Sequence, residues 1–250
     1  MGNNSDDRVA LVTGAAQRIG AAIARELHRA GCRVLVHYRS SAAGAEQLAR
    51  ELNAVRPDSC ATVQGDLCRP DDVRELAARA TTLAPGLDLL VNNASAFYAT
   101  ALGSVDEAQW NELFDANLRG AFFLSQALAP ALARRQGAIV NIVDIHADIP
   151  LPLHAVYTMA KAGLAMMTRA LAVELGPSVR VNGVAPGAIL WPEQPNAVLG
   201  AAHADALLAQ TALKRMGTPE DIAGATRFLG LEAPYVTGQI LAVDGGRNLY

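Results

Sequence analysis

The sequence predicts an α/β fold, in which one parallel sheet is covered by helices on both faces. Short runs of Val, Ile and Leu alternate along the chain with longer segments of helical periodicity. Several short runs are almost continuously apolar, which is typical of strands buried on both faces. The length of 250 residues and the hydrophobic share of 51% suit one domain with a sizeable core. We therefore expect residues 1–250 to form a single doubly wound domain with a seven-stranded parallel sheet.

The elements follow one another as strand, helix, strand. Strands are expected at residues 9–13, 33–38, 61–64, 87–92, 138–143, 180–185 and 240–243. Helices are expected at 20–30, 42–52, 71–80, 107–134 and 157–175, and the fourth of these segments is long enough for two helices. This order implies right-handed βαβ units, so ligands should bind beyond the carboxyl ends of the strands.

Composition excludes several functions. The net charge of −3 leaves no broad basic surface for nucleic acid or an anionic membrane. The three cysteines are odd in number and scattered, which argues against a disulfide framework or a metal site. The N-terminus lacks a signal-peptide pattern, and no apolar run is long enough to span a bilayer. We therefore expect a cytoplasmic protein.

The first strand leads into a turn that contains two glycines. Its residues are Gly14, Ala15, Ala16, Gln17, Arg18, Ile19 and Gly20. A strand, a glycine turn and a helix N-terminus together form a phosphate site of the Rossmann type, although the spacing is not G-x-G-x-x-G. Arg18 could direct its donors at a pyrophosphate or at a substrate carbonyl. The alternative is an ordinary tight turn.

The end of the second strand indicates which dinucleotide binds. Its residues are His37, Tyr38, Arg39 and Ser40. No acid is present to accept from a ribose 2′-hydroxyl, whereas Arg39 and Ser40 can hold a 2′-phosphate, so NADPH/NADP+ is expected. The alternative is that Arg39 is a solvated surface residue. After the third strand come Asp66 and Leu67, where Asp66 either accepts from the adenine amino group or caps the next helix.

The fourth strand is followed by polar and aromatic residues. Asn93 and Ala94 come first, and asparagines in such turns hydrogen-bond the backbone and shape ligand-facing loops. Ser95, Phe97 and Tyr98 follow. Adjacent aromatic residues outside a strand suggest that a flat ligand ring stacks on one of them, and core packing of at least one is the alternative.

The fifth strand brings the candidate acid–base residues. Tyr157 and Lys161 are four residues apart on a predicted helix and therefore share one face. A nearby lysine cation favours the phenolate and lowers a tyrosine pKa from its usual value of about 10. Tyr157 could then exchange a proton with a ligand while Lys161 also binds a ribose. Asp144 directly follows the strand, thirteen residues before Tyr157.

Six motifs in this order resemble the short-chain dehydrogenase/reductase family over essentially the whole chain. They are Thr13-Gly14…Gly20, Asn92-Asn93-Ala94, Asn117, Tyr157…Lys161, Pro186-Gly187 and Asp244-Gly245-Gly246. The resemblance implies hydride transfer, with Tyr157 as proton donor, Lys161 on the nicotinamide ribose and Asn117 holding a relay water. It places the nicotinamide against Pro186, Gly187 and Ile189. It also implies a homotetramer, packed through the helices near residues 117–134 and 157–175.

One residue departs from the family pattern and points to one branch. Asp144 stands where the family places a serine, and an ionised aspartate cannot donate to a substrate carbonyl. A protonatable ring nitrogen would not need that donor. Together with the Arg18 turn, residues 37–40, 93–98 and 157–161 are similar to the pteridine reductases. That resemblance implies that Phe97 stacks on a pterin, that Ser95 and Arg18 contact cofactor phosphate and pterin, and that Asp144 and Tyr157 manage protons.

Residues 190–210 are rich in Pro and Ala, and we expect them to close over the substrate, with Leu190 and Trp191 in contact with it. A plain surface excursion is the alternative. His146, His154 and His203 lack metal-ligand spacing and are expected at the surface or on the pocket rim.

Three functions remain open from the sequence. The first is NADPH-dependent reduction of dihydropterins to tetrahydropterins, with dihydrofolate as a further possible substrate. The second is a generic carbonyl or 3-oxoacyl reductase in which Asp144 merely replaces serine. The third is a non-catalytic NADPH sensor or scaffold, against which the intact Tyr157, Lys161 and Asn117 argue.

Overall fold

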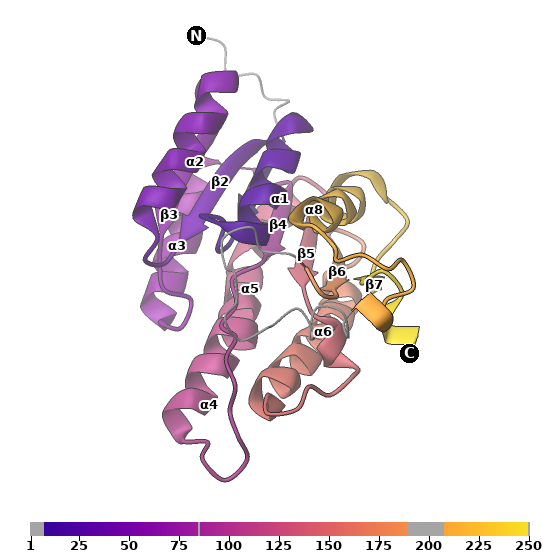
Figure 1. The fold of residues 1–250 in the computed structure, drawn as a ribbon. Helices are drawn as coiled ribbons and strands as arrows, with labels where there is room; N and C mark the ends of the chain where they lie inside the picture. The colour runs from indigo at the N-terminus through magenta and orange to yellow at the C-terminus, as the bar shows by residue number, and fades with distance from the viewer. Residues whose placement is uncertain (1–7, 85, 190–207, 250) are drawn as a thin grey trace.

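The computed structural model describes residues 8–84, 86–189 and 208–249, which form one seven-stranded parallel sheet with helices on both faces (Figure 1). The strands lie in the order β3-β2-β1-β4-β5-β6-β7. Their bounds are β1 Val9–Val12, β2 Arg33–Tyr38, β3 Cys60–Gln64, β4 Leu89–Asn92, β5 Ala138–Ile142, β6 Arg180–Pro186 and β7 Ile240–Val243. The order reverses between β1 and β4, and ligands of doubly wound sheets bind at this crevice. The predicted fold class is confirmed.

Two layers of helices cover the sheet. One layer holds α1 Arg18–Arg29, α2 Ala42–Val55 and α8 Pro219–Arg227. The other holds α3 Pro70–Leu83, α5 Gly120–Ala133 and α6 Ala155–Leu175, and α4 Glu107–Phe114 extends from it (Figure 1). The short elements η2 Ile145–Ala147 and η4 Arg247–Leu249 lie near the carboxyl ends of the strands.

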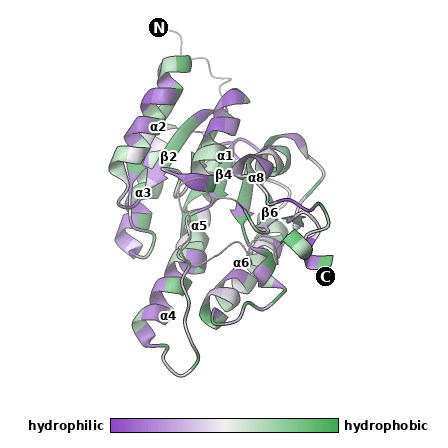
Figure 2. Ribbon diagram, viewed as in Figure 1, coloured by the Kyte–Doolittle hydropathy of each residue, from purple (hydrophilic) through white to green (hydrophobic). Residues whose placement is uncertain are grey.

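Both faces of the central strands β1, β4 and β5 are buried, which explains their continuous apolar runs. Leu11 and Leu35 pack under α3, α5 and α6, whereas Val12 and Val36 pack under α1, α2 and α8. Successive side chains of a strand point to opposite faces, so a strand covered twice needs apolar residues at every position. In Figure 2 the strands are mainly green, while α1, α2 and α3 carry purple outward faces. Across the described ranges, no helix combines the length and apolarity that a membrane crossing needs.

The predicted strands and helices are all present, with ends that shift by up to three residues. The sequence analysis did not predict α8. Its start has a local signal, because Thr218 and Asp221 form a capping box and Pro219 occupies the first turn. The Thr218 N–H donates to Asp221 Oδ2 at 2.9 Å.

The predicted helical segment 107–134 is divided by a π-helical turn, η1 Asp115–Arg119. Asn117 lies in this turn, and its side-chain Nδ2 donates to the Leu113 carbonyl at 2.9 Å. The Gly120 N–H donates to the Asp115 carbonyl, five residues back. An inserted side-chain donor is a known cause of such bulges, so Asn117 itself accounts for the break between α4 and α5.

Candidate active site

The glycine turn between β1 and α1 is packed too closely for larger residues. Gly14 has φ +60°, and a Cβ there would lie 2.9 Å from the Cα of Ala94. A Cβ on Gly20 would lie 2.3 Å from the carbonyl oxygen of Gly14. Arg18 begins α1 with φ +54°, in the left-handed region that usually favours glycine. The turn is therefore held tightly against the end of β4, with a helix N-terminus beside it.

Asn93 ties the same turn to β4. Its Nδ2 donates to the carbonyls of Thr13 at 2.8 Å and of Gly14 at 3.1 Å. The N–H groups of Asn93 and Ala94 both donate to Thr13 Oγ1. The Asn93 side chain thus shapes the turn, as expected of an asparagine at this position.

His37 does not lie where a cofactor could touch it. Its side chain is buried, with 1% of the residue exposed. The Gly14 N–H donates to its Nδ1 at 3.1 Å, and its Nε2 lies 3.0 Å from the Gly65 carbonyl oxygen. Burial lowers the pKa of His37 to about 4, so the ring is neutral. The predicted direct contact between His37 and the cofactor is therefore wrong, because the ring lies beneath the turn.

The end of β2 presents the other predicted cofactor residues. Arg39 and Ser40 are exposed just beyond the strand, and Tyr38 is half-buried. Nothing in the described part of the chain forms an ion pair with the guanidinium of Arg39. A cation and a hydroxyl at this place, beside a glycine turn and a helix N-terminus, fit a dinucleotide with an extra phosphate.

Asp66 forms a local turn after β3. Its Oδ1 accepts the Cys68 N–H at 3.0 Å, and its own N–H donates to Asp72 Oδ2 at 2.9 Å. Helix α3 has Arg69 as its N-cap residue, without a side-chain cap bond, so the alternative that Asp66 caps this helix is wrong. Leu67 beside it is buried.

Asp144 and Tyr157 are in direct contact. The Tyr157 hydroxyl donates to Asp144 Oδ2 at 2.6 Å, while Oδ1 accepts the His146 N–H at 2.9 Å. Only 4% of Tyr157 is exposed. Burial first, and then the charge and hydrogen bond of Asp144, raise the pKa of Tyr157 well above its usual value. The aspartate therefore holds the tyrosine in its protonated form.

Lys161 points away from the tyrosine hydroxyl. Its Nζ donates to the Ile142 carbonyl at 2.9 Å and lies 5.8 Å from the centroid of the Tyr157 ring. Burial lowers the pKa of Lys161 to about 8, against the opposing effect of Asp144. The expectation that Lys161 lowers the pKa of Tyr157 is therefore wrong, since burial and Asp144 raise this pKa.

Phe97 and His154 form an aromatic pair at the edge of this cluster. Their rings stack with centroids 4.7 Å apart, and the edge of Phe97 meets Tyr157 at 4.8 Å. Phe97 is 58% exposed. Tyr98, in contrast, packs with Leu113 and donates its hydroxyl to Glu112 Oε2 at 3.0 Å. His154 was expected only as a surface or rim residue, although its place one helical turn before Tyr157 could have indicated the contact.

Asn117 and Ser95 bond to one another rather than pointing into open space. Ser95 Oγ donates to Asn117 Oδ1 at 2.7 Å, and Asn117 Nδ2 donates to the Ala96 and Leu113 carbonyls. Both polar atoms of the Asn117 side-chain amide are thus hydrogen-bonded. Contacts from these residues to a relay water, a phosphate or a pterin stay predictions.

The end of β6 supplies the remaining predicted residues. Pro186 closes the strand, and a Cβ on Gly187 would lie 2.6 Å from the Cα of Asp244. Ile189 is buried and forms a bridge with Gly217. Leu190 and Trp191, and residues 190–207 of the predicted closing segment, lie outside the described residues.

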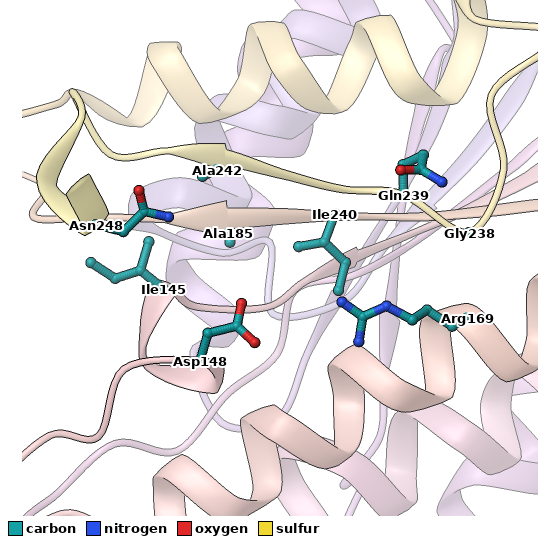
Figure 3. A pocket seen from close by; sticks show the side chains of 9 residues that line it. All are labelled: Ile145, Asp148, Arg169, Ala185, Gly238, Gln239, Ile240, Ala242 and Asn248. Carbon is teal, nitrogen blue, oxygen red and sulfur yellow. The ribbon is translucent and has the colours of Figure 1, made fainter.

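A cavity of about 380 Å³ lies beside Ile145, the residue that follows Asp144. Its lining residues are Ile145, Asp148, Arg169, Ala185, Gly238, Gln239, Ile240, Ala242 and Asn248. Figure 3 shows Asp148 and Arg169 facing one another across it. A second cavity, of about 430 Å³, lies by Leu213 and Asp244. Neither Phe97 nor Tyr157 lines either cavity, so the acid–base cluster is distinct from both.

The fold and these contacts define a class of protein. A doubly wound parallel sheet with a glycine turn after β1, and a buried tyrosine and lysine one helical turn apart, are the parts of a dinucleotide-dependent oxidoreductase. The chain belongs to the short-chain dehydrogenase/reductase family. Residues 14–248 match the family model described as enoyl-(acyl carrier protein) reductase.

Proteins of similar sequence are named as an oxidoreductase and as reductases, which is consistent with this family. An uncharacterized oxidoreductase of Methylorubrum extorquens is 37% identical over 96% of this chain and 98% of its own length. The 3-oxoacyl-[acyl-carrier-protein] reductase FabG of Staphylococcus epidermidis is 37% identical over the same shares. A 3-oxoacyl-[acyl-carrier-protein] reductase of Synechocystis is 35% identical over 97% of this chain and 98% of its own length.

Proposed function

We propose that this oxidoreductase reduces pterins with NADPH, converting dihydropterins to tetrahydropterins, with dihydrofolate as a further candidate substrate. The observation that supports this best is the 2.6 Å hydrogen bond from Tyr157 to the carboxylate of Asp144, beside the exposed ring of Phe97. A pterin is a flat, polar heterocycle, and an aromatic platform next to proton-handling groups suits it.

The cofactor in this proposal is NADPH. The N-terminus of α1 and the glycine turn would hold its pyrophosphate, and Arg39 and Ser40 would hold the 2′-phosphate. Pro186 and Gly187 would lie against its nicotinamide ring, which supplies a hydride when the cofactor is bound. The exposed cation at the end of β2, where an acid would serve NAD, is the reason for preferring NADPH.

The Asp144–Tyr157 pair favours a substrate with a C=N bond over a ketone. An ionised aspartate only accepts hydrogen bonds, so it cannot polarise a carbonyl as a serine hydroxyl would. Reduction of C=N adds a hydride to carbon and a proton to nitrogen. Tyr157 would donate that proton, and the carboxylate of Asp144, which accepts from the tyrosine hydroxyl, would pass a replacement from solvent.

A second candidate is reduction of a 3-oxoacyl thioester. The names of the Staphylococcus and Synechocystis relatives favour it over pterin reduction. In that reaction Tyr157 would protonate the carbonyl oxygen without help from a neighbouring serine. Asp144 would then replace the serine without a specific role.

A substrate comparison separates the two candidates. We would follow NADPH oxidation with dihydrobiopterin, dihydromonapterin and dihydrofolate, and in parallel with a β-keto ester. The pterin proposal expects turnover of at least one dihydropterin and little turnover of the ester. Turnover of the keto ester alone would show that the second candidate is correct.

A further inference from the structure

Three features of the described residues lie outside the proposed chemistry: the cavity beside Arg169, the apolar outer faces of α5 and α6, and the buried ring of His37. The first has no ligand-directed group that is buried, and the second belongs to the subunit packing that the family resemblance already implies. His37 is different, because both of its ring nitrogens are used and one of them holds the turn expected to bind the cofactor.

We propose that His37 is a positioning residue for the cofactor, which acts by holding the Gly14 amide and so fixing the shape of the phosphate-binding turn. The inference rests on the cofactor use proposed above but not on the identity of the substrate. His37 is the penultimate residue of β2, and the turn that it holds lies between β1 and α1. The two segments come together because β1 and β2 are paired in the sheet.

Hydrogen bonds from both sides hold the turn at Gly14. From β2, the neutral Nδ1 of His37 accepts the Gly14 N–H at 3.1 Å, and the His37 carbonyl accepts the Ala15 N–H at 2.8 Å. From β4, Asn93 Nδ2 donates to the Gly14 carbonyl at 3.1 Å. Both polar backbone atoms of Gly14 are therefore satisfied by protein.

This arrangement decides which amides face a ligand. Because the Gly14 N–H is directed at His37, it does not serve a phosphate. The turn leads into the N-terminus of α1, and the first-turn N–H groups of a helix have no intrahelical acceptor, so an anion would bind at that end of the turn. Arg18 has a left-handed backbone at φ +54°, which costs a non-glycine residue free energy. A turn that contains such a residue needs outside support to keep its shape.

Histidine suits this place because it accepts at one nitrogen and donates at the other. The Nε2–H donates to the Gly65 carbonyl at 3.0 Å, which leaves Nδ1 as the acceptor for Gly14. A protonated ring would present two donors and could not accept from Gly14. Burial keeps the ring neutral, with a pKa of about 4, although the nearby charge of Asp66 acts in the opposite direction.

Two substitutions test the two hydrogen bonds of the His37 ring one at a time. Asparagine at 37 can place an oxygen acceptor near the position of Nδ1, whereas glutamine can place an amide donor near the position of Nε2. We expect His37→Asn to retain the dissociation constant for NADPH, measured by cofactor fluorescence, and His37→Gln to weaken binding about tenfold, as for the loss of one well-placed hydrogen bond.

A matched control uses the other buried histidine of this layer. His28 lies on α1 and bonds to Ser59 Oγ at 2.7 Å, away from the turn. His28→Asn should lower the thermal midpoint without changing the dissociation constant for NADPH. A purely structural role for His37 would instead give equal binding by His37→Asn and His37→Gln, and that result would overturn the proposal.

A measurement on the unaltered protein covers the case in which the variants do not fold. Long-range ¹H–¹⁵N spectra of the histidine rings should show one ring in the neutral form with the proton on Nε2, unchanged down to about pH 5. Sequential assignment of the isotope-labelled wild-type protein identifies the ring as that of His37. A His37 ring that carries its proton on Nδ1, or that protonates above pH 6, would contradict the assignment.

Discussion

At the scale of the residue, the contact between Asp144 and Tyr157 is the feature on which the proposed chemistry depends. The tyrosine has two charged neighbours, a lysine and an aspartate, and the aspartate is the one that contacts its hydroxyl. Burial, and then the charge of Asp144 and its 2.6 Å hydrogen bond, raise the pKa of Tyr157, while the lysine is directed to a backbone carbonyl. The tyrosine therefore holds its proton more tightly than a free tyrosine does, and the aspartate is the group beside it that can receive or return a proton.

Substitution of Asp144 tests this contact. We expect Asp144→Ser to lower kcat for dihydropterin reduction about a hundredfold or more, because it removes a group that handles the transferred proton. NADPH binding, measured by fluorescence, should not change. Asp148→Ser, at an exposed carboxylate nearby, is the control and should keep the wild-type rate. Equal rates for Asp144→Ser and the wild type would refute a proton role.

The pH dependence of the free energy of unfolding tests the lowered pKa of Lys161. Burial lowers the pKa of Lys161 to about 8 in the folded protein, whereas in the unfolded chain it is near 10.5, so the unfolded state binds more protons in between. The free energy of unfolding of the wild type, relative to that of Lys161→Met, should therefore increase as the pH rises from about 8 to 10. Denaturant titrations at several pH values measure this difference.

The comparison with Lys161→Met matters because other groups titrate in the same range. Burial raises the pKa of Cys32, Cys60 and Cys68 to about 11, which makes the folded state lose stability above the usual thiol pKa. Both proteins share that loss, so it cancels in the difference. A flat difference between the wild type and Lys161→Met over this pH range would contradict the lowered pKa of Lys161.

At the scale of the element, the ends of helices carry information that hydrophobic periodicity lacks. Helix α8 was not predicted, since its nine residues are too few for a clear apolar repeat, yet its capping box is present in the sequence. Helix α4 begins with the same device, in which Asp106 and Gln109 cap one another. The break between α4 and α5 depends on one side chain, Asn117.

The cap of α8 makes a prediction for stability. Thr218→Ala should lower the free energy of unfolding by about 1 kcal/mol, because the Asp221 N–H loses its side-chain acceptor. Urea denaturation followed by circular dichroism measures the change. Thr82→Ala, in the exposed last turn of α3, is the control and should alter stability by less. Equal effects of the two changes would mean that the box contributes little.

At the scale of the whole molecule, the outer faces of α5 and α6 remain apolar. Phe122 and Phe123 on α5, and Met166 and Val173 on α6, are exposed, with Met166 at 60%. Apolar patches of this kind mark surfaces that other chains cover. We propose that they pack against other copies of this chain, which accords with the homotetramer expected from the family resemblance.

Oligomeric state can be measured directly. Light scattering after size exclusion should give the mass of a tetramer for the wild type and a smaller mass for Met166→Glu, because a buried unpaired charge opposes association. Val55→Glu, at an exposed position on α2 in the opposite layer, should leave the mass unchanged. A monomeric wild type would show that these faces have another use.

The sequence by itself determined the parallel sheet and the place of the site. The bounds of β2 and β7 follow from local apolar runs alone, and the glycine turn and the Tyr157–Lys161 spacing are local patterns as well. Such patterns can be read from the sequence because hydrophobic periodicity, turn residues and helix spacing each depend on only a few neighbouring residues.

Only the tertiary structure decided how these groups act on one another. It placed His37 beneath the turn, directed Lys161 to a β5 carbonyl, stacked His154 on Phe97, and gave the Tyr157 proton a partner in Asp144. Each of these outcomes depends on burial and on hydrogen bonds between residues from different elements. A pKa or a ring contact is set by everything within a few ångströms, and sequence spacing does not reveal that surrounding.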